Sequence, residues 1–147
     1  MALKERFLAD MKEAMKSGEK TKLSTIRMIR TAIINAEKEK GDELADPDIV
    51  DILVSLSKQR RESIKAYESG GRQDLCDKEK AELDFLLSYL PEQMSEEDIK
   101  KKVEEIIKQT EASSMKDMGK VMKVLMAELK GKAEGSTVNR IVKDALS

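Results

Sequence analysis

Apolar residues recur every three or four positions along almost the whole chain, the spacing that places side chains on one face of an α-helix. The first run follows Leu3, Phe7, Met11 and Met15 and stops near Ser17-Gly18. We expect three further helices in the first ninety residues. The first begins at a Thr21 N-cap and ends near Gly41, and the second begins at an Asp46 N-cap followed by Pro47 and ends at the "SGG" at 69–71. The third begins at an Asp74 N-cap and ends at Leu90. The first part of the chain is therefore predicted to contain four helices.

A break in the pattern occurs at "SYLPEQMSEED". Pro91 ends the preceding helix, because the residue before a proline is disfavoured in the helical conformation. Ser95 with Asp98 resembles a capping box and predicts the next helix start. Three helices then follow, near 96–111, 115–129 and 136–146. The predicted fold is all-α, with an N-terminal helical domain at 1–94 and a three-helix C-terminal domain at 95–147.

Composition supports an all-helical soluble protein. Of the 147 residues 39% are charged, 3% are aromatic, and His and Trp are absent. The net charge of −1 gives no overall attraction to nucleic acid, so any such binding needs a local basic patch. The single cysteine excludes an intramolecular disulfide and fits a reducing compartment. With a charged N-terminus and no long apolar run, we expect no signal peptide, no membrane span and a cytoplasmic location.

Two stretches are specific enough to indicate a family. They are Tyr89-Leu90-Pro91-Glu92-Gln93 and the pattern "MGKVM" at 118–122 with "KGKAEG" at 130–135. Together with "KQRRESIKAYESGGRQDL" at 58–75, they resemble the GatB/YqeY family of small helical proteins, over essentially the whole chain. Lys123, Ala127 and Glu134 depart from this pattern, since the family often has glycine, proline and aspartate there.

The resemblance implies an N-terminal helical domain and a smaller three-helix domain. It also implies kinship with the tail of the B subunit of the tRNA-dependent amidotransferase, a carbon–nitrogen ligase that uses glutamine as amido donor on mischarged glutamyl- or aspartyl-tRNA. In that enzyme the tail contacts tRNA and does no chemistry. A related module is appended to some glutaminyl-tRNA synthetases. The implied role is a tRNA-binding accessory function, with an aminoacyl-tRNA-modifying enzyme as a further partner.

A basic series in the last third of the chain is the candidate RNA contact. Residues 113–147 carry seven basic and four acidic side chains, and the helical wheel gathers several lysines on the side opposite the apolar stripe. The candidate RNA-binding residues are Lys116, Lys120, Lys123, Lys130, Gly131, Lys132, Gly135 and Arg140. The alternative is a solvated helix face, with Gly131 as a helix C-cap and Ser136 or Thr137 as the next N-cap.

Lysine and glycine would contact backbone phosphates and shape rather than base sequence, and two Tyr and two Phe offer little stacking. The expected target is therefore a folded RNA such as tRNA. No histidine base, Walker loop or metal-ligand cluster is present, so we predict no enzyme activity and no cofactor. The competing hypothesis is a helical protein–protein adaptor with no RNA contact, which would bind with little dependence on salt.

Three other features each allow two interpretations. Met115, Met118, Met122 and Met126 follow helix spacing and predict core packing in preference to a pliable binding groove. Cys76 is interpreted as a small buried side chain in preference to a redox-sensitive thiol. Arginines 27, 30, 60 and 61 can form a second phosphate site or pair with Glu37, Glu62 or Glu82, and we favour the ion pairs.

Overall fold

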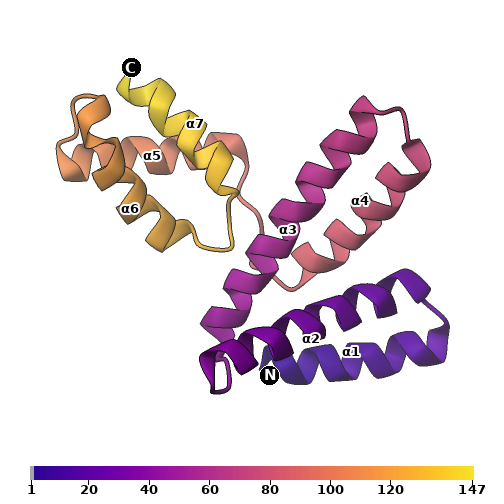
Figure 1. Ribbon diagram of the computed structural model, residues 1–147. Coiled ribbons are helices and arrows are strands. Elements are labelled where there is room, and N and C mark those ends of the chain that lie inside the picture. Colours follow the sequence, from indigo (N-terminus) through magenta and orange to yellow (C-terminus); the bar gives the residue numbers. More distant parts are fainter. Residues whose placement is uncertain (1) are drawn as a thin grey trace. The chain divides into compact units, whose positions relative to one another are not determined.

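The computed structural model describes residues 2–147 and shows an all-α protein (Figure 1). The helices are α1 Leu3–Ser17, α2 Lys20–Lys40, α3 Asp46–Ser69, α4 Gln73–Ser88, α5 Glu96–Thr110, α6 Met118–Leu129 and α7 Gly135–Leu146, with a short 3-10 segment, η1, at Met115–Asp117. Strands are absent from these residues. The predicted fold class and the predicted order of four and three helices are confirmed.

The chain divides into two compact units, the first ending at Leu90 and the second comprising Pro91–Ser147. Their buried apolar clusters share no residue, since one runs from Leu3 to Tyr89 and the other from Ile99 to Leu146. Residues 91 to 94, which we expected in the first domain, belong to the second unit. The Met94 N–H donates to the Lys132 carbonyl oxygen at 2.8 Å, which ties this segment to the C-terminal helices.

Two helical hairpins build the first unit. α1 runs beside α2 and α3 beside α4, and α2 also packs on both α3 and α4 (Figure 1). Tyr89, at the end of α4, returns to α1: its hydroxyl donates to Asp10 Oδ2 at 2.5 Å and its ring meets Phe7 edge to face with centroids 4.8 Å apart. Burial is the main reason that the pKa of Tyr89 is raised, and the hydrogen bond to Asp10 is the second largest cause. The start of the "YLPEQ" stretch is thereby fixed to the first unit.

Several predicted helix caps were wrong by one or more residues. Asp46 is the first residue of α3 rather than its cap, and its Oδ1 accepts from the Leu3 N–H at 3.3 Å. Asp74 lies inside α4 and pairs with Arg72. The partner of Asp46 is 43 residues away along the chain, whereas that of Asp74 is only two residues away. Ser95 does cap α5, accepting from the Asp98 N–H at 3.2 Å, as predicted.

The favoured interpretations of Arg60 and of Cys76 agree with the structure. Arg60 Nε lies 3.0 Å from Glu82 Oε2 and 3.4 Å from Glu79 Oε2, and the arginine side chain is 18% exposed. Arg60 therefore belongs to a largely enclosed ion-pair cluster. Cys76 is fully buried, with its Sγ 3.8 Å from Glu68 Oε1.

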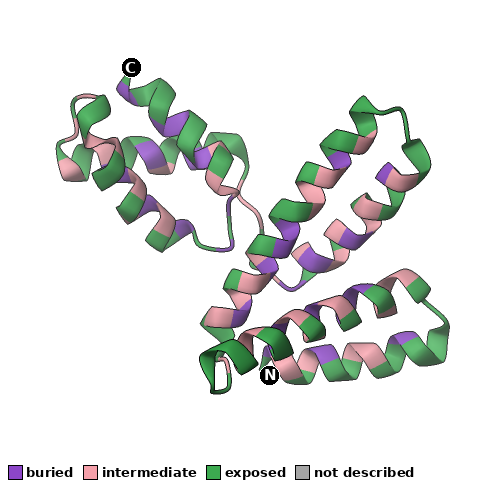
Figure 2. Cartoon of the chain, in the orientation of Figure 1, coloured by how far each residue is buried: buried purple, intermediate pink, exposed green. Residues whose placement is uncertain are grey.

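The second unit packs α5, α6 and α7 around one apolar cluster, and buried positions recur at helical intervals along each helix (Figure 2). On α6 the core positions are Val121, Leu125 and Leu129. Three of the four methionines in the series, at 118, 122 and 126, are half-buried against this core, as predicted. Met115 is 42% exposed, because it lies in η1, where the wheel of α6 no longer applies.

Candidate nucleic-acid interface

The candidate RNA contact is a run of lysines on η1, α6 and the turn after α6. Lys116, Lys120 and Lys123 are exposed, and so are Lys130 and Lys132 in the turn. The core stripe of α6 explains this exposure, because a helix that buries positions 121, 125 and 129 turns positions 120 and 123 outward. We call these five residues the lysine face.

Two carboxylates on the same segment are engaged in contacts of their own. Glu128 Oε2 lies 2.8 Å from Lys102 Nζ on α5, and this hydrogen bond raises the pKa of Lys102. Asp117 Oδ2 accepts from the Ser113 N–H at 2.9 Å, and that bond lowers the pKa of Asp117, with a smaller contribution from nearby Lys120. Glu128 is thus paired with a cation, whereas Asp117 keeps its negative charge and is held in position by its backbone donor.

The lysines differ in their own contacts. Lys120 Nζ donates to the Thr110 carbonyl oxygen at 3.0 Å, so its charge also stabilises the C-terminal end of α5. Within residues 2–147, Lys116, Lys123 and Lys132 make no hydrogen bond or ion pair through their side chains. These three ammonium groups are therefore available to phosphate at no cost to an internal contact.

The turn that joins α6 to α7 is held in place by the segment after Pro91. The C-cap of α6 is Lys130, so the prediction of Gly131 as the cap was wrong by one residue. Gly131 follows it in the turn and adopts the left-handed conformation with φ 78°, which favours glycine. Gln93 Nε2 donates to the Gly131 carbonyl oxygen at 2.6 Å. The two motifs that indicate the family are thus in direct contact, and together they fix the backbone that carries Lys130 and Lys132.

The two glycines have different surroundings. Gly131 is buried, so it contributes by shaping the turn rather than by a backbone approach to RNA. Gly135 is half-buried and is the first residue of α7, where an added Cβ would meet Met126 Cε at an ordinary 3.8 Å. The N-cap is Glu134, so the prediction of a Ser136 or Thr137 cap was wrong.

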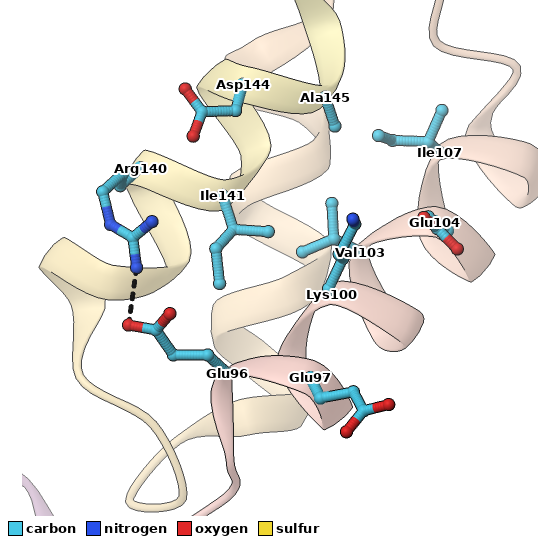
Figure 3. Close-up of a pocket in the computed structure, with 10 residues that line it drawn as sticks. All are labelled: Glu96, Glu97, Lys100, Val103, Glu104, Ile107, Arg140, Ile141, Asp144 and Ala145. Carbon is cyan, nitrogen blue, oxygen red and sulfur yellow. Dashed lines mark hydrogen bonds and ion pairs between the residues drawn. The ribbon is translucent and has the colours of Figure 1, made fainter.

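Arg140 is not brought together with the lysine face. Its Nη2 donates to Glu96 Oε1 at 2.6 Å, and both residues line a groove between α5 and α7 that contains none of the five lysines (Figure 3). No local pattern predicts this pairing, because the partners are 44 residues apart and meet only through helix packing. The ion pair with Glu96 offsets the charge of Arg140 at this groove.

Replacing Gln93 by alanine will loosen the turn. The Gly131 carbonyl oxygen would lose its side-chain donor in a buried position, which costs about 1–2 kcal/mol. We expect urea denaturation to show this loss, with faster amide hydrogen exchange at Lys132. The matched variant Gln109→Ala, which removes an exposed bond to Glu105, should change neither. Equal protection of the turn in both variants would show that Gln93 does not hold it.

No group of three or more His, Cys, Asp or Glu side chains in the described part of the chain is arranged to hold a metal ion. From Ala2 to Ser147, no helix combines the length and apolar character needed to cross a bilayer.

Comparison with known proteins gives one family. The model of the family described as Yqey-like protein matches residues 4–146. The fungal relative named Altered inheritance of mitochondria protein 41, mitochondrial, from Pyrenophora tritici-repentis is 34% identical over 133 residues, which are 89% of this chain and 73% of the relative. Proteins of the same name are 34% identical in Candida glabrata, with 71% and 59% covered, and 29% identical in Saccharomyces cerevisiae strain YJM789, with 85% and 66% covered. The matched region thus leaves a substantial part of some relatives uncovered.

Proposed function

The chain belongs to the YqeY-like family, and on that premise we propose that it is a non-catalytic tRNA-binding accessory module. Its contact surface would be the lysine face of the second unit. The proposal builds on the resemblance to the tail of the tRNA-dependent amidotransferase, in which the tail contacts tRNA while other regions perform the chemistry. The chemistry would here belong to a separate aminoacyl-tRNA-modifying enzyme, and the relation to carbon–nitrogen ligases would be one of kinship.

The observation that carries the proposal is the gathering of exposed lysines on one short segment whose neighbouring acids are engaged. A lysine ammonium is a compact charge on a flexible stem, suited to phosphate oxygens whose positions vary. Lys116 and Lys123 are exposed, while Glu128 is paired with Lys102 and Asp117 is held by backbone donors. Residues 116–134 carry five lysines and three acidic residues, a net charge of +2, whereas the whole chain has a net charge of −1.

A folded RNA fits this surface better than an unpaired strand. Recognition of unpaired bases relies on exposed aromatic side chains on which bases stack. Phe7 and Tyr89, two of the four aromatic residues, are 1% and 6% exposed in the core of the first unit. Phosphate contacts by lysine confer little base preference, so we expect similar affinities for different tRNAs.

Binding of bulk tRNA across a salt series tests this function. Four phosphate contacts predict a log–log slope of about −3 for the binding constant against salt concentration, because each contact releases condensed counterions. The measurement is a gel shift or fluorescence anisotropy titration with the full chain. A slope near zero, or no binding at low salt, would contradict the proposal and favour the adaptor without RNA contact.

The cytoplasmic location stays a prediction. The relatives carry the word mitochondrial in their names. We propose only that the chain works in a compartment that contains tRNA, a condition that both locations satisfy.

A further inference from the structure

A groove of about 690 Å³ lies between α5 and α7 in the second unit. It is lined by Glu96, Glu97, Lys100, Val103, Glu104, Ile107, Arg140, Ile141, Asp144 and Ala145, and we call it the α5–α7 groove. Figure 3 shows the Glu96–Arg140 ion pair at one end and Ile107 with Ala145 at the other. The third helix of the unit, α6, contributes no residue to it.

The floor of the groove is apolar and continuous with the core. Val103 is fully buried, Ile141 is 8% exposed, and Ile107 packs half-buried against the same cluster. Ala145 is exposed and short, so a partner backbone can approach α7 closely at that end. A surface of this kind accepts the apolar stripe of another helix.

The rim of the groove is acidic. Glu96 and Arg140 neutralise each other, which leaves Glu97, Glu104 and Asp144 facing Lys100 alone, a net charge of −2. Within the described residues these three carboxylates make no hydrogen bond or ion pair through their side chains. They are therefore free to receive cations from a ligand.

We infer that the α5–α7 groove docks a basic amphipathic helix of a partner protein. The apolar floor would receive the partner's apolar stripe, and the three carboxylates would pair with lysines or arginines beside that stripe. Residues 96 and 107 of α5 are eleven positions apart, so the groove extends about 16 Å and accommodates three turns of helix. RNA is a poor occupant, because its phosphates would face the carboxylates.

The inference goes beyond the proposed RNA contact and does not depend on it. Apart from Arg140, none of the candidate RNA-binding residues lines the groove. The second unit would then offer a lysine surface to tRNA and an acidic groove to a protein. Such an arrangement joins a folded RNA to an enzyme without competition for one site.

The test uses a labelled synthetic helical peptide of 14 residues, with leucines at i, i+3, i+4 and i+7 and lysines beside them, and a matched peptide with glutamates in place of the lysines. Binding to the full chain is followed by fluorescence anisotropy and by NMR shifts of α5 and α7 amides. We expect the lysine peptide to bind at least about tenfold tighter than the glutamate peptide, because of the net acidic rim. No binding of the lysine peptide at about 1 mM would overturn the inference.

Two variants in which an alanine is replaced by arginine test where the peptide binds. Ala145→Arg fills the groove and adds a positive charge, and it should weaken binding by about tenfold or more. Ala127→Arg makes the same change at an exposed position of α6 outside the groove and should leave the affinity unchanged. Helical circular dichroism and tRNA binding of Ala145→Arg should match those of the unmodified chain. Equal peptide affinity in both variants would place the peptide elsewhere and overturn the assignment, whatever the tRNA result.

Discussion

Reversing the charges of Lys116, Lys123 and Lys132 together will lower tRNA affinity on the order of 500-fold at 0.1 M salt. Each phosphate contact contributes about eightfold at this salt concentration through counterion release, and three contacts multiply. These lysines make no internal side-chain contact in the described chain, so the variant should keep the fold. Lys120 is left in place, because its bond to the Thr110 carbonyl oxygen supports the end of α5.

The control reverses three exposed lysines of the first unit, Lys12, Lys16 and Lys20. Both triple variants change the net charge from −1 to −7, since each substitution removes one positive and adds one negative charge. We expect the control to keep most of its tRNA affinity and the variant of the lysine face to lose most of its salt dependence, with a slope of about −1 remaining for one phosphate contact. Equal losses of tRNA affinity in the two triple variants would mean that overall charge governs binding, and the lysine face would then not be the site.

The helices could be predicted from the sequence because their signal is local. Apolar spacing, Gly18, Gly41 and Pro91 act within a few residues, and each predicted helix corresponds to an observed one. The helix starts were less predictable where a polar side chain had a distant partner. Asp46 has the chemistry of an N-cap, yet its carboxylate accepts from Leu3, 43 residues away, and the helix begins at Asp46 itself.

In the candidate site, too, features set by local sequence could be predicted and features set by distant partners could not. The exposure of Lys120 and Lys123 follows from one helical wheel and could be predicted. The contact of Gln93 with Gly131, the pair of Arg140 with Glu96 and the α5–α7 groove arise from packing between helices. One sequence does not specify which faces of two helices meet, so the basic series in the sequence includes Arg140, whereas the structure places Arg140 beside Glu96 in the α5–α7 groove.

Replacing Leu125 by alanine will unfold the second unit and leave the first intact. Leu125 is fully buried in the cluster of α5, α6 and α7, and truncating such a leucine costs about 3–5 kcal/mol through lost burial and the cavity left behind. A unit of 57 residues, Pro91–Ser147, is expected to have a small free energy of unfolding, comparable to this cost. Hydrogen exchange and limited proteolysis should therefore show loss of protection across α5 to α7 only.

The reciprocal variant is Leu86→Ala, which truncates an equally buried leucine in the cluster of the first unit. It should release protection in α1 to α4 while α5 to α7 stay folded, because the two clusters share no residue. Since the proposed RNA contact lies entirely on the second unit, Leu86→Ala should retain tRNA binding that Leu125→Ala loses. A single transition that removes all seven helices in both variants would instead make the chain one cooperative unit, and the lysine face would then depend on the first unit for its stability.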